Sequence, residues 1–514
     1  MPHRHLVVTL RADAPGPVNG RLLVFTRRAE ESGKQAATSI ADMDEFEPSA
    51  MSVAACDVHR LEPGSRVDID LDELAFPKGF SQLQPGRYLI QALLDTNGDY
   101  THFGRGAGDL ESPAKVVTVG DATTLPVFAL GKPLPERDPW QLPSSWPQWI
   151  RDSVPAARAN AHPMAFVSSA LSAFWGRPMT MRGWVLTPRG YDPSAPTTYP
   201  TVYYFGSYGG SMARSAGEVA QIQALADQGA LPPMIWVFPD ESLASGNHVF
   251  ADSVNNGPWA TALVGELIPY LEMHYRMDAK PAGRFVTGHS SGGWASLWLQ
   301  VRYPATFGGT WSTAPDPIDF HDFLNTDLYT AHANVYRRPD GSSTPVVREH
   351  GQAVMSMRES SQLERVLGKE GGQMNSFEWV FSPRGADGRP QPLFDRDTGA
   401  VDPAVAREWI DHYDIVRQLQ REWPTKRSQL HGKLHVIVGD EDTYYLDGPV
   451  ALLKQAMDAM HASSDIRFIP GRNHNDLYSV GDDRAGLLKR IGWEMYEVAR
   501  PGTATKVQSL SGAR

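Results

Sequence analysis

Ser290 is the residue of this sequence whose surroundings best fit nucleophilic chemistry. It is the centre of Gly288-His289-Ser290-Ser291-Gly292, which matches the pattern G-x-S-x-G. In that pattern a sharp turn between a strand and a helix holds the serine in a strained conformation, and small neighbours avoid collisions. An apolar run precedes Gly288 and a helix-like segment follows Gly292. We therefore expect Ser290 to project from the edge of a sheet, with the Ser291 N–H directed at a developing oxyanion.

Ser290 needs a base, because a serine hydroxyl is a poor nucleophile by itself. Asp442 lies just after the strand-like run "HVIVG", and His474 lies just after "FIPG". The carboxyl ends of strands form the edge at which open α/β sheets bind ligands. We predict Asp442 as the acid and His474 as the base, with Asp440 as the less favoured acid. If Ser290 instead lies in an ordinary turn, Asp442 would be a loop cap and His474 a surface histidine.

A glycine-rich loop, 206–210, follows the strand-like run "PTVYYF". Glycines allow backbone N–H groups to approach a substrate carbonyl oxygen closely. We expect the N–H of Ser207 to be the second oxyanion donor beside that of Ser291, with Tyr208 as second choice. A plain glycine turn is the alternative.

Three further residues are candidates for contact with a substrate: Gly206, His289 and Asp316. His289 adjoins the nucleophile, but its position directs it away from Ser290, so packing or hydrogen bonding is expected of it instead of proton transfer. Asp316 lies with Asp319 in "TAPDPIDFHDF", just after a strand-like run. These two carboxylates could contact substrate, but an ordinary structural loop is the favoured interpretation.

Strand-like and helix-like runs alternate from about residue 165 to residue 500. The strand-like runs are "RGWVLTP", "PTVYYFG", "PPMIWVFPD", "GRFVTGHS", "TFGGTWSTAP", "KLHVIVGD" and "DIRFIPG". This alternation predicts an α/β domain with a mainly parallel sheet and helices on both faces. Between about 315 and 430 the alternation lapses, with helix candidates near 361–370 and 403–423. Because long structureless loops are uncommon, we predict an inserted cap over the carboxyl edge of the sheet.

Residues 1–130 have the pattern of an all-β domain. The runs "HLVVTL", "GRLLVFTRR", "SRVDIDL", "GRYLIQALLD" and "AKVVTVG" are separated by turn signals. We predict an immunoglobulin-like β-sandwich here. Residues 131–164 interleave prolines with tryptophans, which indicates an extended linker whose aromatic rings pack on a neighbour. Residues 501–514 are expected to be a flexible tail.

The chain from about 175 to 500 resembles the α/β-hydrolase superfamily, and more narrowly its esterase D-like group. That group includes enterochelin-esterase-like enzymes and the feruloyl and acetylxylan esterases. The stretches that carry the resemblance are "TPRGYDPSAPTTYPTVYYFGSYGG", "FVTGHSSGGWASL", "VIVGDEDTYYL" and "GRNHND". The resemblance implies an α/β-hydrolase fold and a serine hydrolase that cleaves carboxylic esters through an acyl-enzyme, without a cofactor. The sequence departs from the group at Phe205, which stands where its members usually have His, and in the length of 315–430.

Other functions remain open on the sequence alone. A serine peptidase or an acyltransferase of the same fold could use the same residues. A non-catalytic carbohydrate- or surface-binding protein could use the fold as a scaffold. The substrate expected of an esterase is a small-molecule or polymer-borne ester, and the sequence does not select the acyl group.

Charge and cysteine content disfavour some classes of binding partner and some kinds of site. The formal net charge of -11 disfavours nucleic acid and anionic membrane surfaces, both of which attract clustered Lys and Arg. With Cys56 as the single cysteine, neither an intrachain disulfide nor a cysteine metal cluster can form. A homo-oligomer is left open. "MPHRHLVVTL" lacks the apolar core of a signal peptide, so either a cytoplasmic protein or, slightly favoured, a secreted or periplasmic bacterial protein without its signal is expected.

No metal site is predicted. The sixteen histidines show no spacing typical of a metal site. Asp95, Asn97 and Asp99 alternate as in a calcium loop, but Thr101 and Gly106 replace the Gly and Glu that such a loop requires. We favour a hairpin turn with "NGD" at its tip.

Overall fold

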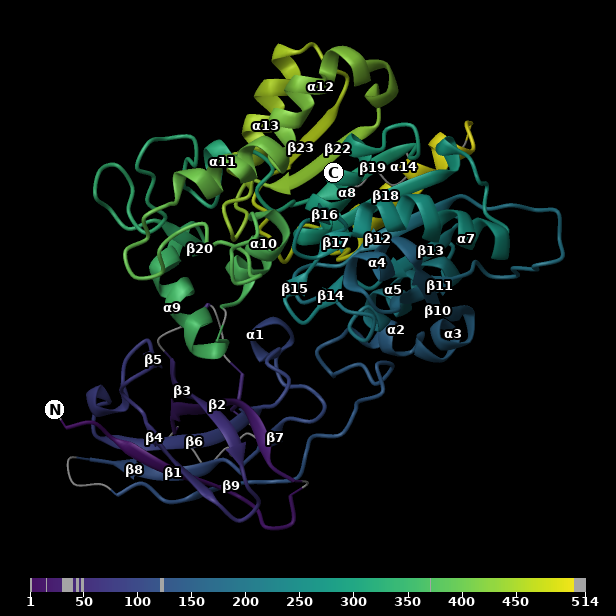
Figure 1. The fold of residues 1–514 in the computed structure, drawn as a ribbon. Helices are drawn as coiled ribbons and strands as arrows, with labels where there is room; N and C mark the ends of the chain where they lie inside the picture. The colour runs from purple at the N-terminus through teal and green to yellow at the C-terminus, as the bar shows by residue number, and fades with distance from the viewer. Residues whose placement is uncertain are drawn as a thin grey trace.

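This computed structural model describes residues 2–14, 16–29, 40–42, 46–47, 50–120, 124–369 and 371–502. An N-terminal group of strands lies apart from a larger C-terminal part built around one sheet (Figure 1). Between them lie a short helix, α1 (Tyr100–Phe103), and a longer one, α9 (Met357–Leu367). The predicted tail from 503 onward falls outside the described residues. None of the described helices has the length and apolar character needed to cross a bilayer.

The C-terminal part contains an eight-stranded sheet. Its order is β10 (Ala161–Ser168), β11 (Met179–Leu186), β13 (Ile235–Pro239), β12 (Thr201–Phe205), β18 (Arg284–His289), β19 (Gly309–Thr313), β22 (Leu434–Gly439) and β23 (Asp465–Ile469). Every strand-like run predicted after residue 165 forms one of these strands. The six strands from β13 to β23 pair in parallel, as expected. All five residues of β13 and of β19 are buried, because parallel strands are covered on both faces.

One edge of this mainly parallel sheet is antiparallel. β10 and β11 pair antiparallel, and β11 pairs antiparallel with β13, so the sheet is mixed. β10 begins at Ala161, within the segment predicted as an extended linker. That segment also forms α2 (Gln148–Arg151) and α3 (Val154–Asn160). Its tryptophans do pack on a neighbour, since the rings of Trp140 and Trp184 lie 5.1 Å apart.

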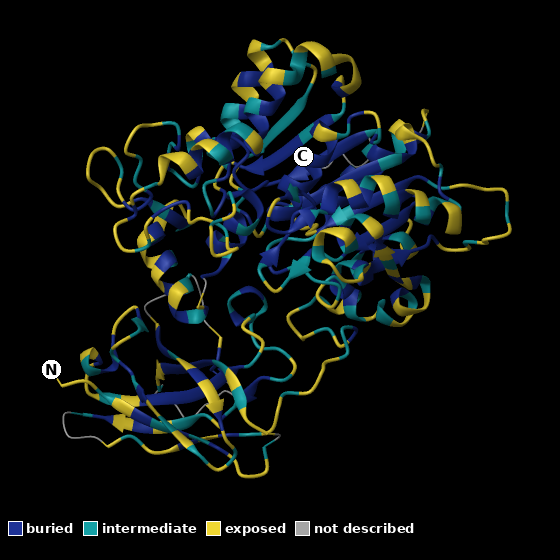
Figure 2. Cartoon of the chain, in the orientation of Figure 1, coloured by how far each residue is buried: buried dark blue, intermediate teal, exposed yellow. Residues whose placement is uncertain are grey.

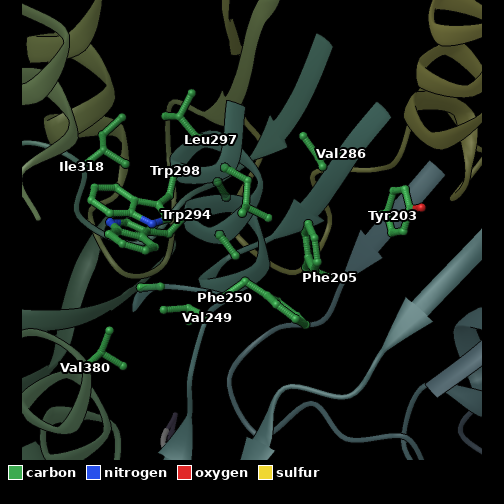
Figure 3. Close-up of a cluster of buried hydrophobic side chains, with 14 of the residues drawn as sticks. Tyr203, Phe205, Val249, Phe250, Val286, Trp294, Leu297, Trp298, Ile318 and Val380 are labelled. Carbon is green, nitrogen blue, oxygen red and sulfur yellow. The ribbon is translucent and has the colours of Figure 1, made fainter. Parts of the chain in front are cut away.

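Helices pack along this sheet. They include α5 (Ala216–Asp227), α7 (Ile268–His274), α8 (Ser291–Arg302), α12 (Ile415–Leu430), α13 (Asp447–Ala459) and α14 (Gly486–Ala499). Buried residues concentrate in the strands and in the helix faces beside them (Figure 2). Trp294 and Trp298 stack one helical turn apart on α8, with ring centroids 5.2 Å apart. Figure 3 shows them among Phe205, Phe250 and other buried side chains, so α8 is fixed directly behind Ser290.

The segment predicted as a cap contains a hairpin and four helices. The hairpin joins β20 (Pro345–Glu349) to β21 (Gln352–Ser356), and α9 follows it. The prediction of a single helix over 403–423 is wrong, because two helices occupy this range. α11 (Pro403–His412) ends first, and Asp414 then caps the start of α12 by accepting the N–H of Arg417. α12 also continues through Pro424, where the sequence suggested an end. α10 (Gln373–Phe381) was not predicted.

The N-terminal part is all-β apart from short helical turns. β4 (Arg66–Asp70), β1 (His5–Leu10) and β9 (Phe128–Leu130) form one sheet. A second sheet contains β5 (Ala75–Phe76), β3 (Met51–Leu61), β2 (Val18–Arg28), β6 (Gly86–Asp95), β7 (Leu110–Glu111) and β8 (Lys115–Val119). Side chains such as Leu6, Val24, Ile90 and Phe128 fill a common core. β3 was not predicted, and the immunoglobulin-like topology stays a prediction.

The turn after β6 is not the tip of a tight hairpin. Residues 96–109 separate β6 from its antiparallel neighbour β7, and they include α1. The Asp95 carboxylate accepts the N–H groups of Asn97, Gly98 and Tyr100. It therefore acts as a cap that turns the chain into α1, which favours a structural role over a calcium ligand.

Candidate active site

Ser290 occupies the turn between β18 and α8. Its backbone has φ 58° and ψ -120°, a conformation that L-residues rarely adopt, and its N–H donates to the Thr313 carbonyl at 3.0 Å. A Cβ on Gly292 would lie 2.2 Å from the Phe205 carbonyl oxygen, and one on Gly288 would lie 2.4 Å from the Gly292 backbone. The glycines of the motif are therefore required by close backbone packing at this turn.

His474 and Asp442 form a buried pair at the ends of β23 and β22. His474 Nδ1 lies 2.8 Å from Asp442 Oδ2. The other oxygen, Oδ1, accepts the N–H groups of Tyr444 and Leu446. Burial opposes ionisation of Asp442, but His474 and these N–H donors outweigh it and hold the pKa of Asp442 below its ordinary value. An ionised Asp442 fixes the proton of His474 on Nδ1 and leaves Nε2 to act as a base.

Asp440 has a different environment. Its side chain is exposed and accepts the N–H of Gly471 at 2.7 Å. It thereby ties the loop after β22 to the loop after β23. The geometry favours Asp442 over Asp440 as the partner of His474.

The loop 206–210 lies beside this turn, and Ser207 Oγ donates to the His289 carbonyl at 3.3 Å. The N–H groups of Gly209 and Gly210 donate to Asn247 Oδ1 and to the Ser207 carbonyl. Among the described residues, no acceptor lies within hydrogen-bonding geometry of the N–H groups of Ser207 and Tyr208. Both residues line the same pocket as Ser290.

Gly206 is placed differently from the prediction. Its N–H donates to Glu241 Oε1 at 2.7 Å, and it lines a cavity behind the loop instead of the pocket that contains Ser290. Burial raises the pKa of Glu241 well above its ordinary value and so favours its neutral form. Glu241 was missed by the sequence analysis. Its position just after β13, at the same edge of the sheet as Ser290, was the available signal.

The pocket around Ser290 has a volume of about 400 Å³. Polar residues that line it include Ser290, His474, Asp316, Ser207 and Tyr208. The predicted cap contributes the apolar wall residues Val346, Val347, Met355, Leu363, Leu367 and Phe377, together with the polar Ser360, Glu364 and Gln373. The cap thus supplies much of the apolar lining of the pocket. None of these wall residues was identified from the sequence, because the cap has no recognisable motif.

Residues 172–475, more than half of the chain, match the family model described as "Putative esterase". The chain belongs to this esterase family. It is 32% identical over 129 residues to the esterases Rv1288 and MT1326 of two strains of Mycobacterium tuberculosis. Each match covers 24% of this chain and 26% of the relative, so the chain spans about a quarter of the length of these curated relatives.

Solved structures of hydrolases are also similar to this family member. A ferulic acid esterase is 14% identical, with a TM-score of 0.41, and the match covers 66% of this chain and 98% of that one. An S-formylglutathione hydrolase from Agrobacterium tumefaciens is 14% identical, with a TM-score of 0.36, and the match covers 66% of this chain and 95% of that one.

Asp316 contacts both serines of the motif in this esterase-family chain. Ser290 Oγ donates to its Oδ1 at 3.3 Å, and Ser291 Oγ donates to its Oδ2 at 2.5 Å. Burial is the main reason that the pKa of Asp316 is raised to about 6. Asp316 therefore belongs to the pocket and is not the ordinary loop residue that the sequence favoured.

Replacing Asp316 by asparagine is expected to change how stability depends on pH. The pKa of Asp316 is raised from 3.8 to about 6 on folding, so the unfolded carboxyl ionises first and the folded state loses stability as the pH rises between these values. Asparagine stays neutral, so the free energy of unfolding of the variant should rise relative to the parent by up to about 3 kcal/mol across this window. Thermal melting of both proteins at pH 4 and pH 7 measures this. An equal difference at the two pH values would contradict it.

His289 packs against two aromatic rings within the site. Its ring centroid lies 4.3 Å from that of His474 and 5.7 Å from that of Tyr478. Burial, followed by the proximity of His474, lowers the pKa of His289 to about 3. His289 is therefore neutral at physiological pH, as expected of a packing residue.

A second group of polar side chains lies within the predicted cap. Ligand atoms of Asp319, His321 and Asp414 lie within 4.8 Å of one another. Asp319 accepts the N–H of His321, while Asp414 caps α12 and accepts the Phe320 N–H and the Tyr329 hydroxyl. These bonds tie the segment after β19 to α12. We assign the group a structural role.

Proposed function

We propose that this protein is a serine hydrolase that cleaves carboxylic esters through an acyl-enzyme intermediate. The observation that carries the proposal is that Ser290, on a strained strand-to-helix turn, and His474 line one pocket, with His474 paired through Nδ1 to the buried Asp442. Membership of the esterase family supports the same reaction.

The roles follow from the geometry. His474 Nε2 accepts the Ser290 proton as Ser290 Oγ attacks the acyl carbonyl carbon, and Asp442 stabilises the charged imidazole. Because Ser290 Oγ donates to Asp316 in this structure, it must turn from Asp316 toward His474 before it attacks. His474 then protonates the leaving alcohol. Water, deprotonated by His474, releases the acyl group and restores Ser290.

The negative charge on the tetrahedral oxygen needs hydrogen-bond donors. The N–H of Ser291, at the start of α8, is one donor, because the first N–H groups of a helix have no partner within it. The N–H of Ser207, or second that of Tyr208, is the other. Six apolar side chains of the cap line the same pocket, so an ester whose acyl or alcohol group carries apolar surface fits the pocket best.

A fluorophosphonate probe tests the proposal directly. The probe is expected to label the parent at Ser290, because it reacts with activated serines, and peptide mass spectrometry identifies the labelled residue. Ser290→Ala should remove the label, whereas Ser291→Ala should keep it, since the adjacent serine contributes only its backbone N–H to catalysis. Labelling at another serine, or equal labelling of Ser290→Ala, would refute the assignment.

A further inference from the structure

The N-terminal domain contacts the loop that carries the candidate oxyanion donors. His102 Nδ1, on α1, lies 2.5 Å from the Tyr208 hydroxyl, and the two rings pack edge to face with centroids 5.9 Å apart. Arg214, just beyond the loop, donates from Nη2 to the Phe103 carbonyl at 2.5 Å. A Cβ on Gly209 would lie 2.6 Å from the His102 carbonyl oxygen. α1 therefore packs against the loop at Tyr208 and Gly209 and against Arg214 just beyond it.

The hydrogen bond between His102 and Tyr208 is partly buried and joins two neutral groups. His102 is buried, and burial lowers its pKa to about 4. Burial also raises the pKa of Tyr208 well above its ordinary value. Both side chains are therefore neutral near pH 7, and their hydrogen bond persists over the working range of a histidine base. A neutral hydrogen bond shielded from water fixes orientation more firmly than an exposed one.

The same domain also holds the cap wall. The buried Arg21, on β2, donates to the carbonyls of Arg365 and Val366 in the last turn of α9. α9 contacts β2, β3 and β5, and its Leu363 and Leu367 line the pocket. The residues of β2 and β3 that face α9, including Leu23, Phe25, Val53 and Ala55, belong to the same hydrophobic core as the C-terminal sheet. In Figure 1, α1 and α9 both lie where the two parts of the molecule meet.

Thr101, the neighbour of His102, reaches the reaction pocket itself. It lines the pocket around Ser290 and also a cavity of about 610 Å³ between the two domains. α1 thus forms part of the partition between these two spaces. A movement of α1 would change both the oxyanion loop and the shape of the pocket.

We propose that the N-terminal domain is a built-in part of the active site and that His102 is a positioning residue for the oxyanion donors. The inference rests on the proposed ester hydrolysis. Loop 206–210 contains three glycines, so by itself it has many conformations of similar energy. The bond from His102 to the Tyr208 side chain selects the conformation in which the neighbouring N–H groups face the pocket. Oxyanion donors act only when they are held in place before the reaction.

A double-mutant cycle tests the bond. His102→Ala and Tyr208→Phe are each expected to lower kcat for p-nitrophenyl acetate about 10-fold to 30-fold, with KM changed less than about twofold, because the donors act on the transition state. The Tyr208 hydroxyl also donates to the Thr101 carbonyl at 3.4 Å. The double variant should be no slower than Tyr208→Phe, because Tyr208→Phe already removes the bond to His102. His102→Asn, whose side chain offers a polar atom near the position of Nδ1, should recover most of kcat. His5→Gln, an exposed histidine on β1, is the control.

Hydrogen–deuterium exchange provides a second measurement that does not depend on turnover. The peptide spanning 206–210 should exchange faster in His102→Ala than in the parent, while the peptide spanning β19 should not change. The role of His102 would be overturned by unchanged kcat in the single variants or by a change confined to KM. It would also be overturned if the two effects multiplied in the double variant or if exchange of the loop did not change. If the parent showed neither turnover nor a label on Ser290, the proposed ester hydrolysis would be refuted instead. The exchange measurement would then still test whether His102 holds the loop 206–210 in place.

Discussion

Ser290→Ala is expected to lower kcat for p-nitrophenyl acetate by at least about 10⁴-fold, because removal of a triad nucleophile leaves only oxyanion stabilisation and binding. Ser290 is buried, lies on the strained turn before α8, and shares a pocket with His474. No other serine is placed on such a turn among the described residues with positive φ. The Ala variant should fold, since alanine at this turn needs no new space.

Steady-state kinetics and thermal melting check this result together. Ser194→Ala, in the exposed loop where Ser194 bonds Asp192, provides the matched control and should retain the parent's kcat. Turnover by Ser290→Ala close to that of the parent would remove the nucleophile assignment. Absence of ester turnover in the parent would instead favour the binding-protein alternative.

Asp442→Asn is expected to lower kcat about 10³-fold to 10⁴-fold, because the base would be held in the wrong tautomer. The asparagine oxygen would still accept hydrogen bonds from the N–H groups of Tyr444 and Leu446, so its NH₂ group would face His474 Nδ1. Nδ1 would then accept a hydrogen bond from this NH₂ group, and the single ring proton would lie on Nε2. Such an imidazole cannot take the proton of Ser290.

Asp442→Asn should also change how the stability of the protein depends on pH. The pKa of Asp442 is lowered on folding, so its carboxylate contributes stability above the ordinary value of 3.8 and loses it as the pH falls through the folded pKa. The parent should therefore exceed Asp442→Asn in melting temperature at pH 7, and the difference should shrink at pH 3. Asp440→Asn, which changes an exposed carboxylate two residues away, is the control and should change kcat less than about fivefold. If kcat fell strongly in Asp440→Asn but not in Asp442→Asn, Asp440 and not Asp442 would be the acid that pairs with His474.

Local patterns predicted the elements that carry the site. Short strand-like runs predicted β12, β18, β19, β22 and β23 correctly. β12 and β22 are rich in apolar residues, because strands covered on both faces need apolar sequence. Errors arose where local signals conflict with tertiary packing. β3 was missed because Asp57, His59 and Arg60 make its second half polar. β10 was missed because prolines and tryptophans nearby resemble a linker, although the strand pairs along its whole length with β11.

Helix boundaries in the cap failed for a similar reason. Asp414 ends one helix and caps the next only because its other oxygen accepts the Phe320 N–H and the Tyr329 hydroxyl from a distant segment. Pro424 lies inside α12, where a proline normally ends a helix. Contacts with the rest of the molecule outweighed the local preference at both positions.

The sequence by itself determined the strand-to-helix turn at Ser290 and the positions of Asp442 and His474 at strand ends. These follow from local sterics and from a parallel sheet, which brings the carboxyl ends of its strands to one edge. Only the tertiary structure decided that Asp316 contacts Ser290, that Glu241 holds Gly206, and that His102 contacts Tyr208 across 106 residues of chain. Such contacts carry no local pattern, because each depends on how separate elements pack in three dimensions.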